Sequence, residues 1–146
     1  MIIAIEYLQL EELKAFLREQ ADDAFPDLKD EQRLDMLAGK WAQNAEFCIC
    51  RNEGSSLVGM IVFYANRPEG EVVYLPHVYV NGEYRGKRVM TSMINYIKDY
   101  VKGKGYKYLK LEVNKNNERA QNAYLHFGFL YSEVSSVETI FMRAKI

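Results

Sequence analysis

The amino-acid sequence predicts an α+β protein with α/β/α layers. A mixed, mostly antiparallel sheet of seven strands with a parallel central pair is accompanied by about four helices. Two observations carry this prediction. Between residues 47 and 80, three apolar strand patterns are separated only by short polar turns, which favours an antiparallel meander. The strand pattern Lys107–Val113 is instead reached through a helix pattern, so we expect it to pair parallel to Val72–Val80.

The chain before the meander predicts one strand and two helices. Ile2–Glu6 is an apolar run that ends at a charged residue, which is typical of a strand. Apolar residues at helical spacing predict a helix over Leu10–Gln20, followed by a loop over Ala21–Asp27 that contains a proline. Asp30 can cap a second helix, whose apolar stripe consists of Leu34, Leu37 and Trp41.

The meander and the elements after it complete the sheet. Its strands are predicted over Phe47–Cys50, Leu57–Ala65 and Val72–Val80, with a glycine available for a positive φ in the first turn. A helix is expected from Val89 to a stop at Gly103–Gly105, and its inward face consists of Val89, Met93, Ile97 and Tyr100. The remaining elements are a helix over Glu118–Phe127 closed by Gly128, and two strands, Phe129–Ser135 and Thr139–Lys145.

Length and composition indicate one folded domain over residues 1–146. A chain of 146 residues is long enough to bury a core, and a hydrophobic content of 49% is too high for a disordered chain. The formal net charge of −1 gives no overall field that would attract nucleic acid or an anionic membrane. We therefore expect neither of these as a partner.

Cysteine usage and hydropathy indicate a cellular location. Cys48 and Cys50 share one predicted strand, where neighbours on the same face are poorly placed to form a disulfide. No other His or Cys residues complete a zinc site, so we expect buried thiols in a reducing compartment and no metal. Met1–Ile5 is too short for a signal peptide and no apolar run reaches membrane-spanning length, so a cytoplasmic protein is expected.

The stretch Val78–Met90 combines the end of a strand, a short cationic loop and the start of a helix. The strand breaks at the turn residues Asn81-Gly82, and the loop then carries Arg85, Lys87 and Arg88. Unpaired N–H groups in the first turn of a helix and the helix dipole both favour an anion. The stretch therefore predicts an anion-binding loop, with a solvated basic turn as the alternative.

Two motifs extend this prediction. The loop and helix start follow the pattern Q/R-x-x-G-x-G/A, in which Arg85 matches while Arg88 and Met90 replace small residues. The pattern N-x-x-A-x-x-x-Y-x-x-x-G-F is met without departure by Asn117, Ala120, Tyr124, Gly128 and Phe129. On these motifs, and on the order of elements over essentially the whole chain, the sequence resembles the GNAT superfamily of N-acetyltransferases.

The resemblance implies that acetyl-CoA is the co-substrate. In that family the loop holds the pyrophosphate, and the pantetheine arm fills a gap between two splayed parallel strands, where a strand N–H polarises the thioester carbonyl. The residues assigned to the coenzyme in this way are Val78, Tyr79, Val80, Arg85, Gly86, Lys87, Arg88, Val89, Met90, Asn117 and Tyr124. Two alternatives stay open: Arg88 either adds a phosphate contact or narrows the loop, and Asn117 either contacts the ligand or only caps its helix.

The resemblance also implies that Tyr124 lies beside the coenzyme sulfur and protonates the departing thiolate, whereas simple packing in the core is the alternative. On the acceptor side, an amine with a pKa near ~10.4 is almost fully protonated at pH 7, so a base or a solvent relay is required. His77 and Glu112, on neighbouring predicted strands, are the candidates for the base. Each of them also has a purely structural alternative.

The predicted function is acetyl transfer to a primary amine of a small molecule or to an exposed amino group, by direct attack in a ternary complex. A covalent acetyl-cysteine route is not expected, because the cysteines lie on an outer strand. In the family the loop between the first two helices borders the acceptor pocket, and here it favours a cationic amine through Asp22, Asp23, Asp27 and Asp30. The alternatives are a non-catalytic acyl-CoA-binding domain and a scaffold without coenzyme, and pairing into a homodimer stays open.

Overall fold

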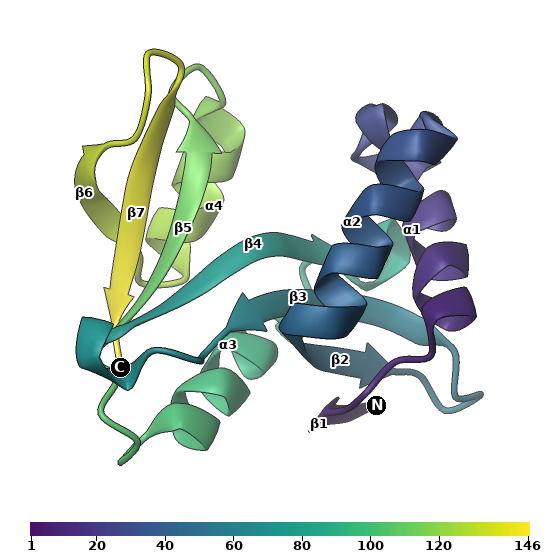
Figure 1. The fold of residues 1–146 in the computed structure, drawn as a ribbon, viewed down its shortest axis with the longest axis horizontal. Coiled ribbons are helices and arrows are strands. Elements are labelled where there is room, and N and C mark those ends of the chain that lie inside the picture. The colour runs from purple at the N-terminus through teal and green to yellow at the C-terminus, as the bar shows by residue number, and fades with distance from the viewer.

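A computed structural model describes residues 1–146 and contains a seven-stranded sheet in the order β1-β2-β3-β4-β5-β7-β6 (Figure 1). The strands are β1 (Ile2–Ile5), β2 (Glu46–Arg51), β3 (Leu57–Tyr64), β4 (Val72–Val80), β5 (Tyr108–Asn114), β6 (Leu130–Val134) and β7 (Thr139–Lys145). All neighbouring strands are antiparallel except β4 and β5, which are parallel. The predicted mixed sheet with a parallel central pair is confirmed.

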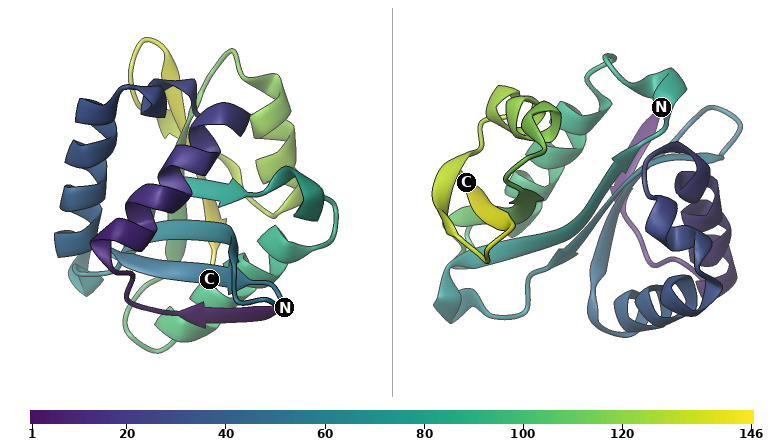
Figure 2. Two further views of the ribbon diagram at one scale, coloured as in Figure 1. Left: turned by 90° about the vertical axis from the view of Figure 1, so that its right-hand side faces the viewer. Right: turned by 90° about the horizontal axis from the view of Figure 1, so that it is seen from above.

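Helices cover both faces of the sheet. They are α1 (Leu10–Asp23), α2 (Glu31–Asn44), α3 (Val89–Val101) and α4 (Glu118–His126), with short 3₁₀ turns at Pro26–Lys29, Pro68–Gly70 and Gly82–Tyr84. Figure 2 shows α1 and α2 on one side of the sheet and α3 and α4 on the other. The predicted α/β/α layers and the four helices are confirmed.

Each helical layer has its own apolar core. The core beneath α3 and α4 includes Met93, Ile97, Leu109, Leu111 and Phe129. The core beneath α1 and α2 includes Leu13, Leu17, Leu34, Trp41 and Met60. Each of these side chains contributes about 1.5–3 kcal/mol through its burial, so the two cores hold the sheet between the helices.

The largest difference in element boundaries lies at the end of α1. This helix runs to Asp23 rather than to the predicted Gln20, because Ala21 is buried against the α1–α2 core and packing favours another helical turn. The predicted loop Ala21–Asp27 is correspondingly shorter, and its last two residues begin the 3₁₀ turn Pro26–Lys29. The other boundaries agree with the prediction to within one residue.

The parallel pair β4–β5 separates after only three residue pairs. The last of them joins Tyr74 to Lys110, so the end of β4, His77–Val80, pairs only with β3 (Figure 1). The separation coincides with an irregularity in β4. His77 pairs with Val62 and Tyr74 pairs with Tyr64, so β4 has two residues, Leu75 and Pro76, opposite one residue of β3. Pro76 has no N–H to donate to a ladder, so its presence is compatible with a strand edge that has no partner there.

We expect the Asp30 carboxylate to stabilise α2 as its N-cap. It accepts hydrogen bonds from the N–H groups of Gln32 at 3.0 Å and Arg33 at 3.4 Å, as the sequence predicted. Asp30→Ala should lower the free energy of unfolding by about 1 kcal/mol, measured by urea denaturation. Asp22→Ala is the control, because Asp22 is exposed without a hydrogen-bond partner, and should change stability by less than ~0.5 kcal/mol. Equal losses in the two variants would contradict the assignment.

Candidate active site

The loop between β4 and α3 leaves a run of backbone N–H groups without partners. None of the N–H groups from Gly86 to Thr91 donates a hydrogen bond within the protein. Gly86 and Arg88 have φ angles of 78° and 64°, in the left-handed region. Unpaired N–H groups in such a turn, followed by the N-terminus of α3, form a concavity that favours an anion.

Space and charge at this loop also suit an anion. A Cβ added at Gly86 would meet no atom within 4 Å, so a ligand can approach the backbone closely there. The Lys87 ammonium lies 5.5 Å from the centre of the Tyr84 ring, and Arg88 is exposed without an ion-pair partner. The left-handed backbone explains why glycine suits position 88, since a residue with a Cβ costs about 1 kcal/mol in this conformation.

The Arg85 side chain points away from the unpaired N–H groups. Its Nε–H donates to the carbonyl oxygen of Val80 at 2.9 Å, and its other nitrogens contact the Asp23 carboxylate at 2.5 and 3.3 Å. The Tyr79 hydroxyl donates to the same carboxylate at 2.7 Å, and this bond, followed by Arg85, holds the pKa of Asp23 below its ordinary value. Arg85 therefore connects the loop to the end of α1.

The end of β4 presents an unpaired strand edge. The Val80 carbonyl is turned toward Arg85, whereas the N–H of Asn81 donates to Val58 of β3. Because successive residues of an antiparallel strand direct their N–H and C=O groups to opposite edges, the backbone groups of Val78 face the open edge like those of Val80. This edge is where β5 has separated, so an extended chain could pair there.

The residues predicted on α4 lie at its start and in its second turn. Asn117 caps the helix, because its side-chain oxygen accepts from the N–H of Ala120 at 3.1 Å. The Tyr124 ring is half-buried against the α3–α4 core and meets Phe129 edge-on at 5.8 Å. Its hydroxyl has no hydrogen-bond partner in the protein, and burial raises the pKa of Tyr124, which keeps the hydroxyl protonated near neutral pH.

His77 faces the α1–α2 layer rather than the open strand edge. Its ring stacks between Phe25 and Trp41 at centroid distances of 4.4 and 5.0 Å, and its Nε2 lies 2.6 Å from Oε1 of Gln20. An amide oxygen only accepts, so Nε2 carries the hydrogen and Nδ1 keeps a lone pair. Burial lowers the pKa of His77 to about 4, so the ring is neutral near pH 7.

Glu112 lies on β5, on the face opposite Leu111 and Val113 as predicted. Its carboxylate is exposed and accepts hydrogen bonds from the hydroxyls of Thr139, at 2.9 Å, and Ser135. It is also close enough to Tyr74 to raise the pKa of that phenol, although burial raises it more. Glu112 thus lies near the point where β4 and β5 separate.

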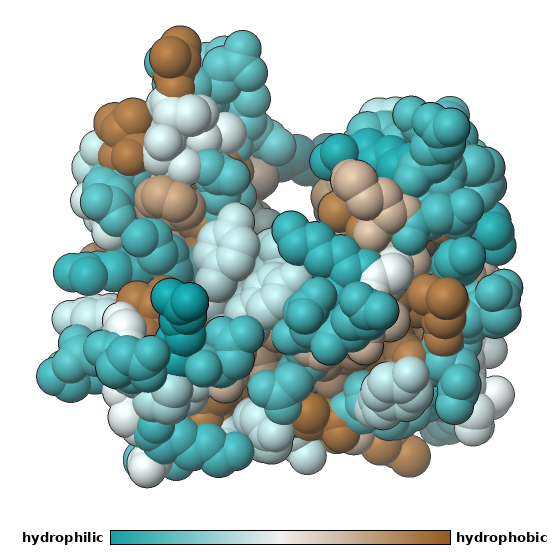
Figure 3. Space-filling view, in the orientation of Figure 1, coloured by the Kyte–Doolittle hydropathy of each residue, from teal (hydrophilic) through white to brown (hydrophobic).

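A pocket of about 320 Å³ lies between α2 and β4, beside the last β4–β5 pair. Its aromatic walls are formed by Phe25, Trp41, Tyr64, Tyr74 and His77. The space-filling view shows the molecule hollowed between the lobe of α4 and β5–β7 and the lobe of α1 and α2 (Figure 3). The aromatic pocket and the open edge of β4 are thus separated by the strand that forms both.

Two sets of residues complete the description of the site. The sequence patterns did not point to Gln20, Tyr64 or Tyr74, and the only signal for this corner was Pro76, an unusual residue for an inner strand.

The thiols of Cys48 and Cys50 are buried and unpaired, and burial raises the pKa of Cys48 to about 12. Neither thiol is therefore activated as a nucleophile.

These features define a class of protein: a three-layer α/β/α fold whose mixed sheet is split at its parallel pair, with a cationic loop of unpaired backbone N–H groups between the central strand and the next helix. The model of the Acetyltransferase (GNAT) family matches residues 10–129, and the chain belongs to this family. The resemblance that the sequence motifs indicated is confirmed.

The chain is similar to individual proteins of known sequence or structure, at low sequence identity. An N-acetyltransferase of Methanocaldococcus jannaschii is 28% identical over 102 residues, which cover 65% of this chain and 45% of that protein. The chain thus spans less than half the length of this relative. The PaiA N-acetyltransferase of Thermoplasma acidophilum, solved with coenzyme A, has a TM-score of 0.72 at 18% identity over 100% of both chains.

A spermidine N-acetyltransferase chimera built from Vibrio cholerae and human sequences has a TM-score of 0.72 at 16% identity, over 97% of this chain and 95% of the other. At such identities these structures establish the shared fold.

No helix of the structure has the length and apolar character needed to cross a membrane. No group of three or more His, Cys, Asp or Glu side chains is arranged to hold a metal ion.

We predict that His77 makes the protein less stable in mild acid. Its pKa is about 4 in the folded state and 6.5 ordinarily, so the unfolded chain binds a proton that the native state excludes. The stability contributed by the neutral ring is therefore lost as the pH falls from about 6.5 to about 4, by about 3 kcal/mol in total.

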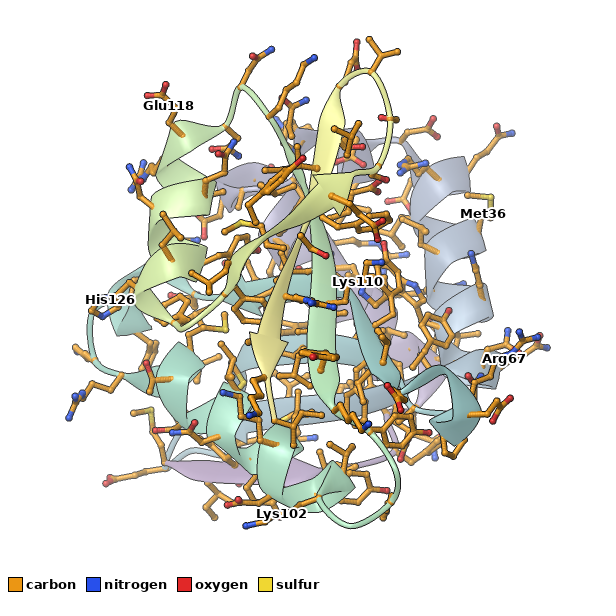
Figure 4. All side chains as sticks on the ribbon, turned by 90° about the vertical axis from the view of Figure 1, so that its left-hand side faces the viewer. Met36, Arg67, Lys102, Lys110, Glu118 and His126 are labelled. Atoms are coloured by element: carbon orange, nitrogen blue, oxygen red, sulfur yellow. The ribbon has the colours of Figure 1, made fainter.

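His77→Gln should flatten the pH dependence of unfolding free energy across that window, measured by urea denaturation. His126→Gln is the matched control, because His126 is the only other histidine and is exposed at the end of α4 (Figure 4). If both variants keep the wild-type slope, His77 is not the group responsible.

Proposed function

We propose that the chain is an acetyl-CoA-dependent N-acetyltransferase that acetylates a primary amine by direct attack in a ternary complex. One observation supports this most strongly. The open edge of β4 and the unpaired N–H groups of Gly86–Thr91 follow one another along the chain. An extended amide-containing arm that ends in phosphates matches both features in the same order. The proposal agrees with the family to which the chain belongs.

We assign the phosphates to the backbone from Gly86 to Met90 together with the side chains of Lys87 and Arg88. The N–H groups supply directional hydrogen bonds, and the two cations supply charge that no protein carboxylate neutralises. Arg85 would act mainly by holding this loop against Val80 and Asp23. Val78 and Val80 would line the pantetheine arm with their backbone, whereas the predicted contribution of Tyr79 is not supported, because its backbone groups face Met60 of β3. The free amide NH₂ of Asn117 can donate to the arm.

The bound thioester supplies an activated acetyl group, whose carbon forms a bond to the acceptor nitrogen while the carbon–sulfur bond breaks. We assign Tyr124 as the donor of a proton to the departing sulfur. Its protonated hydroxyl, free of protein partners, suits this role. A backbone N–H at the open edge of β4 would stabilise the charge that develops on the carbonyl oxygen.

The acceptor nitrogen must also lose a proton, and two residues can assist. His77 is neutral and keeps the Nδ1 lone pair, but its low pKa makes it a weak base. Glu112 is an exposed carboxylate held by two hydroxyls near the separation of β4 and β5. We propose that the amine arrives through solvent as the free base and that Glu112 or His77 takes the proton released on attack.

The acceptor pocket is the cavity between α2 and β4. Its volume of about 320 Å³ suits a small molecule or a single side chain. The fold neighbour named as a spermidine N-acetyltransferase acts, by its name, on a small-molecule amine. A cytoplasmic location and a possible second copy in a homodimer stay predictions from the sequence.

A non-catalytic acyl-CoA-binding domain is the second candidate, favoured by the weak basicity of His77. Two assays separate the candidates. A rise in the thermal unfolding temperature with acetyl-CoA tests binding, and thiol release against a panel of amines tests catalysis. Binding without thiol release from any amine would favour the second candidate.

Tyr124→Phe should lower kcat by about 100-fold with little change in coenzyme affinity, because the substitution removes only the proton donor. Steady-state thiol release measures the first quantity and calorimetric titration with coenzyme A measures the second. Tyr131→Phe is the control, since Tyr131 is an exposed tyrosine on β6. Unchanged turnover in Tyr124→Phe would remove the acid from the mechanism.

Arg88→Gly should change stability and affinity in opposite directions. Relief of the left-handed strain should raise the free energy of unfolding by about 1 kcal/mol. Loss of the phosphate contact should weaken coenzyme A binding by about tenfold. Arg67→Ala, which removes an exposed arginine from the turn between β3 and β4 (Figure 4), should leave coenzyme affinity unchanged. Tighter binding by Arg88→Gly would mean that Arg88 narrows the loop.

A further inference from the structure

We infer that the acceptor carries its amine on an aromatic or flat apolar body together with an anionic group, so that an aromatic amino acid fits this pocket better than a polyamine does. The inference rests on the proposed function, because it names the substrate class of the same pocket. Shape, charge and unpaired polar groups of the pocket each support it.

The walls of the pocket are predominantly aromatic. Phe25 and Trp41 close one side, and Tyr64, Tyr74 and His77 close the side formed by β3 and β4. Rings offer large apolar surfaces and favour other rings in stacked or edge-on arrangements. A flexible polyamine, with a charge every few atoms, would make little apolar contact with these ring surfaces.

The side chains that line the pocket carry a net positive charge, and the nearby Glu112 carboxylate is not among them. Asp27 is the only carboxylate in its lining, and Nε of Arg33 already contacts it at 2.8 Å. Lys40, the second cation of the lining, is exposed and has no ion-pair partner. Arg33 and Lys40 are seven residues apart on α2, about 10 Å along the helix axis, and Arg33 is already paired with Asp27. The free partner is Lys40.

The acidic residues between α1 and α2 do not reverse this charge. Asp23 is engaged with Tyr79 and Arg85, Asp27 with Arg33, and Asp30 with the first N–H groups of α2. Asp22, the fourth aspartate of the segment, does not line the pocket. Several free carboxylates, which a polyamine would need along its length, are therefore absent from the lining.

Two buried polar groups next to the pocket lack partners. The Tyr64 hydroxyl, in the wall, and Nε2 of Gln20, whose Oε1 contacts His77, are buried without hydrogen bonds. Such groups cost about 1–3 kcal/mol unless a ligand or water satisfies them. Tyr64 lies on β3, and Gln20 reaches His77 of β4 from α1. An acceptor with polar groups on a flat body can therefore supply the partners that these two groups lack in the protein.

The single tryptophan of the chain, Trp41, lines this pocket, so its fluorescence reports occupancy without requiring turnover. We propose titrating the coenzyme A-bound protein with L-phenylalanine, with phenethylamine, which has the same body without the carboxylate, and with spermidine. Phenylalanine should saturate the signal at about tenfold lower concentration than phenethylamine, because a charge-assisted contact to Lys40 is added. Spermidine should give no saturable change.

Lys40→Gln should abolish the tenfold preference for phenylalanine and leave phenethylamine binding unchanged. Lys102→Gln, at an exposed lysine beyond the end of α3 (Figure 4), should retain the preference. In turnover, Lys40→Gln should raise KM for phenylalanine about tenfold while kcat stays the same.

Saturation by spermidine but not by phenylalanine, or a preference that survives Lys40→Gln, would overturn the inference. Absence of a saturable signal with all three amines would overturn it too. The proposed function fails separately: if acetyl-CoA binds but no amine releases thiol, the enzyme assignment is wrong, while the Trp41 titration still decides what the pocket binds.

Discussion

The loss of pairing between β4 and β5 beyond Tyr74 is the constraint on which the site depends. Parallel strands in an inner sheet normally satisfy each other's backbone groups, and unpaired buried groups are costly. Here the extra residue opposite β3 and the missing N–H of Pro76 accompany the separation. The two cores, one on each face, hold the halves of the sheet in place, so the split is part of the native structure.

Because the sheet is split, the open edge of β4 and the face of β4 toward α2 have different surroundings. The open edge at Val78–Val80 is followed, after a turn over residues 81–85, by the unpaired N–H groups of Gly86–Thr91, and this order suits an extended ligand that ends in phosphates. The α2 side of the same strand carries Tyr74 and His77 into an aromatic pocket. Arg85 and Asp23 form an ion pair that connects the loop to the end of α1.

Periodicity and turn chemistry were sufficient to predict the order, type and approximate bounds of the strands and helices, including the parallel pairing of β4 with β5. Side-chain placement was less predictable, because it depends on contacts between residues distant in sequence. Arg85 was assigned to phosphates, yet Asp23, brought near by the longer α1, binds its guanidinium. His77 was predicted only as a candidate base, and its contacts with Gln20, Phe25 and Trp41 come from residues far away in the sequence. Tyr64 and Tyr74 carry no local motif.

The central claim is that the open edge of β4 and the loop that follows it bind coenzyme A. Titration of isotopically labelled protein with coenzyme A, followed by backbone amide NMR, tests this residue by residue. The largest saturable shifts should fall on Gly86–Thr91 and on Val78–Val80, whereas amides at the distant turn around Arg67 should not move. Shifts confined to the pocket beneath α2, or no saturable shifts at all, would contradict the account.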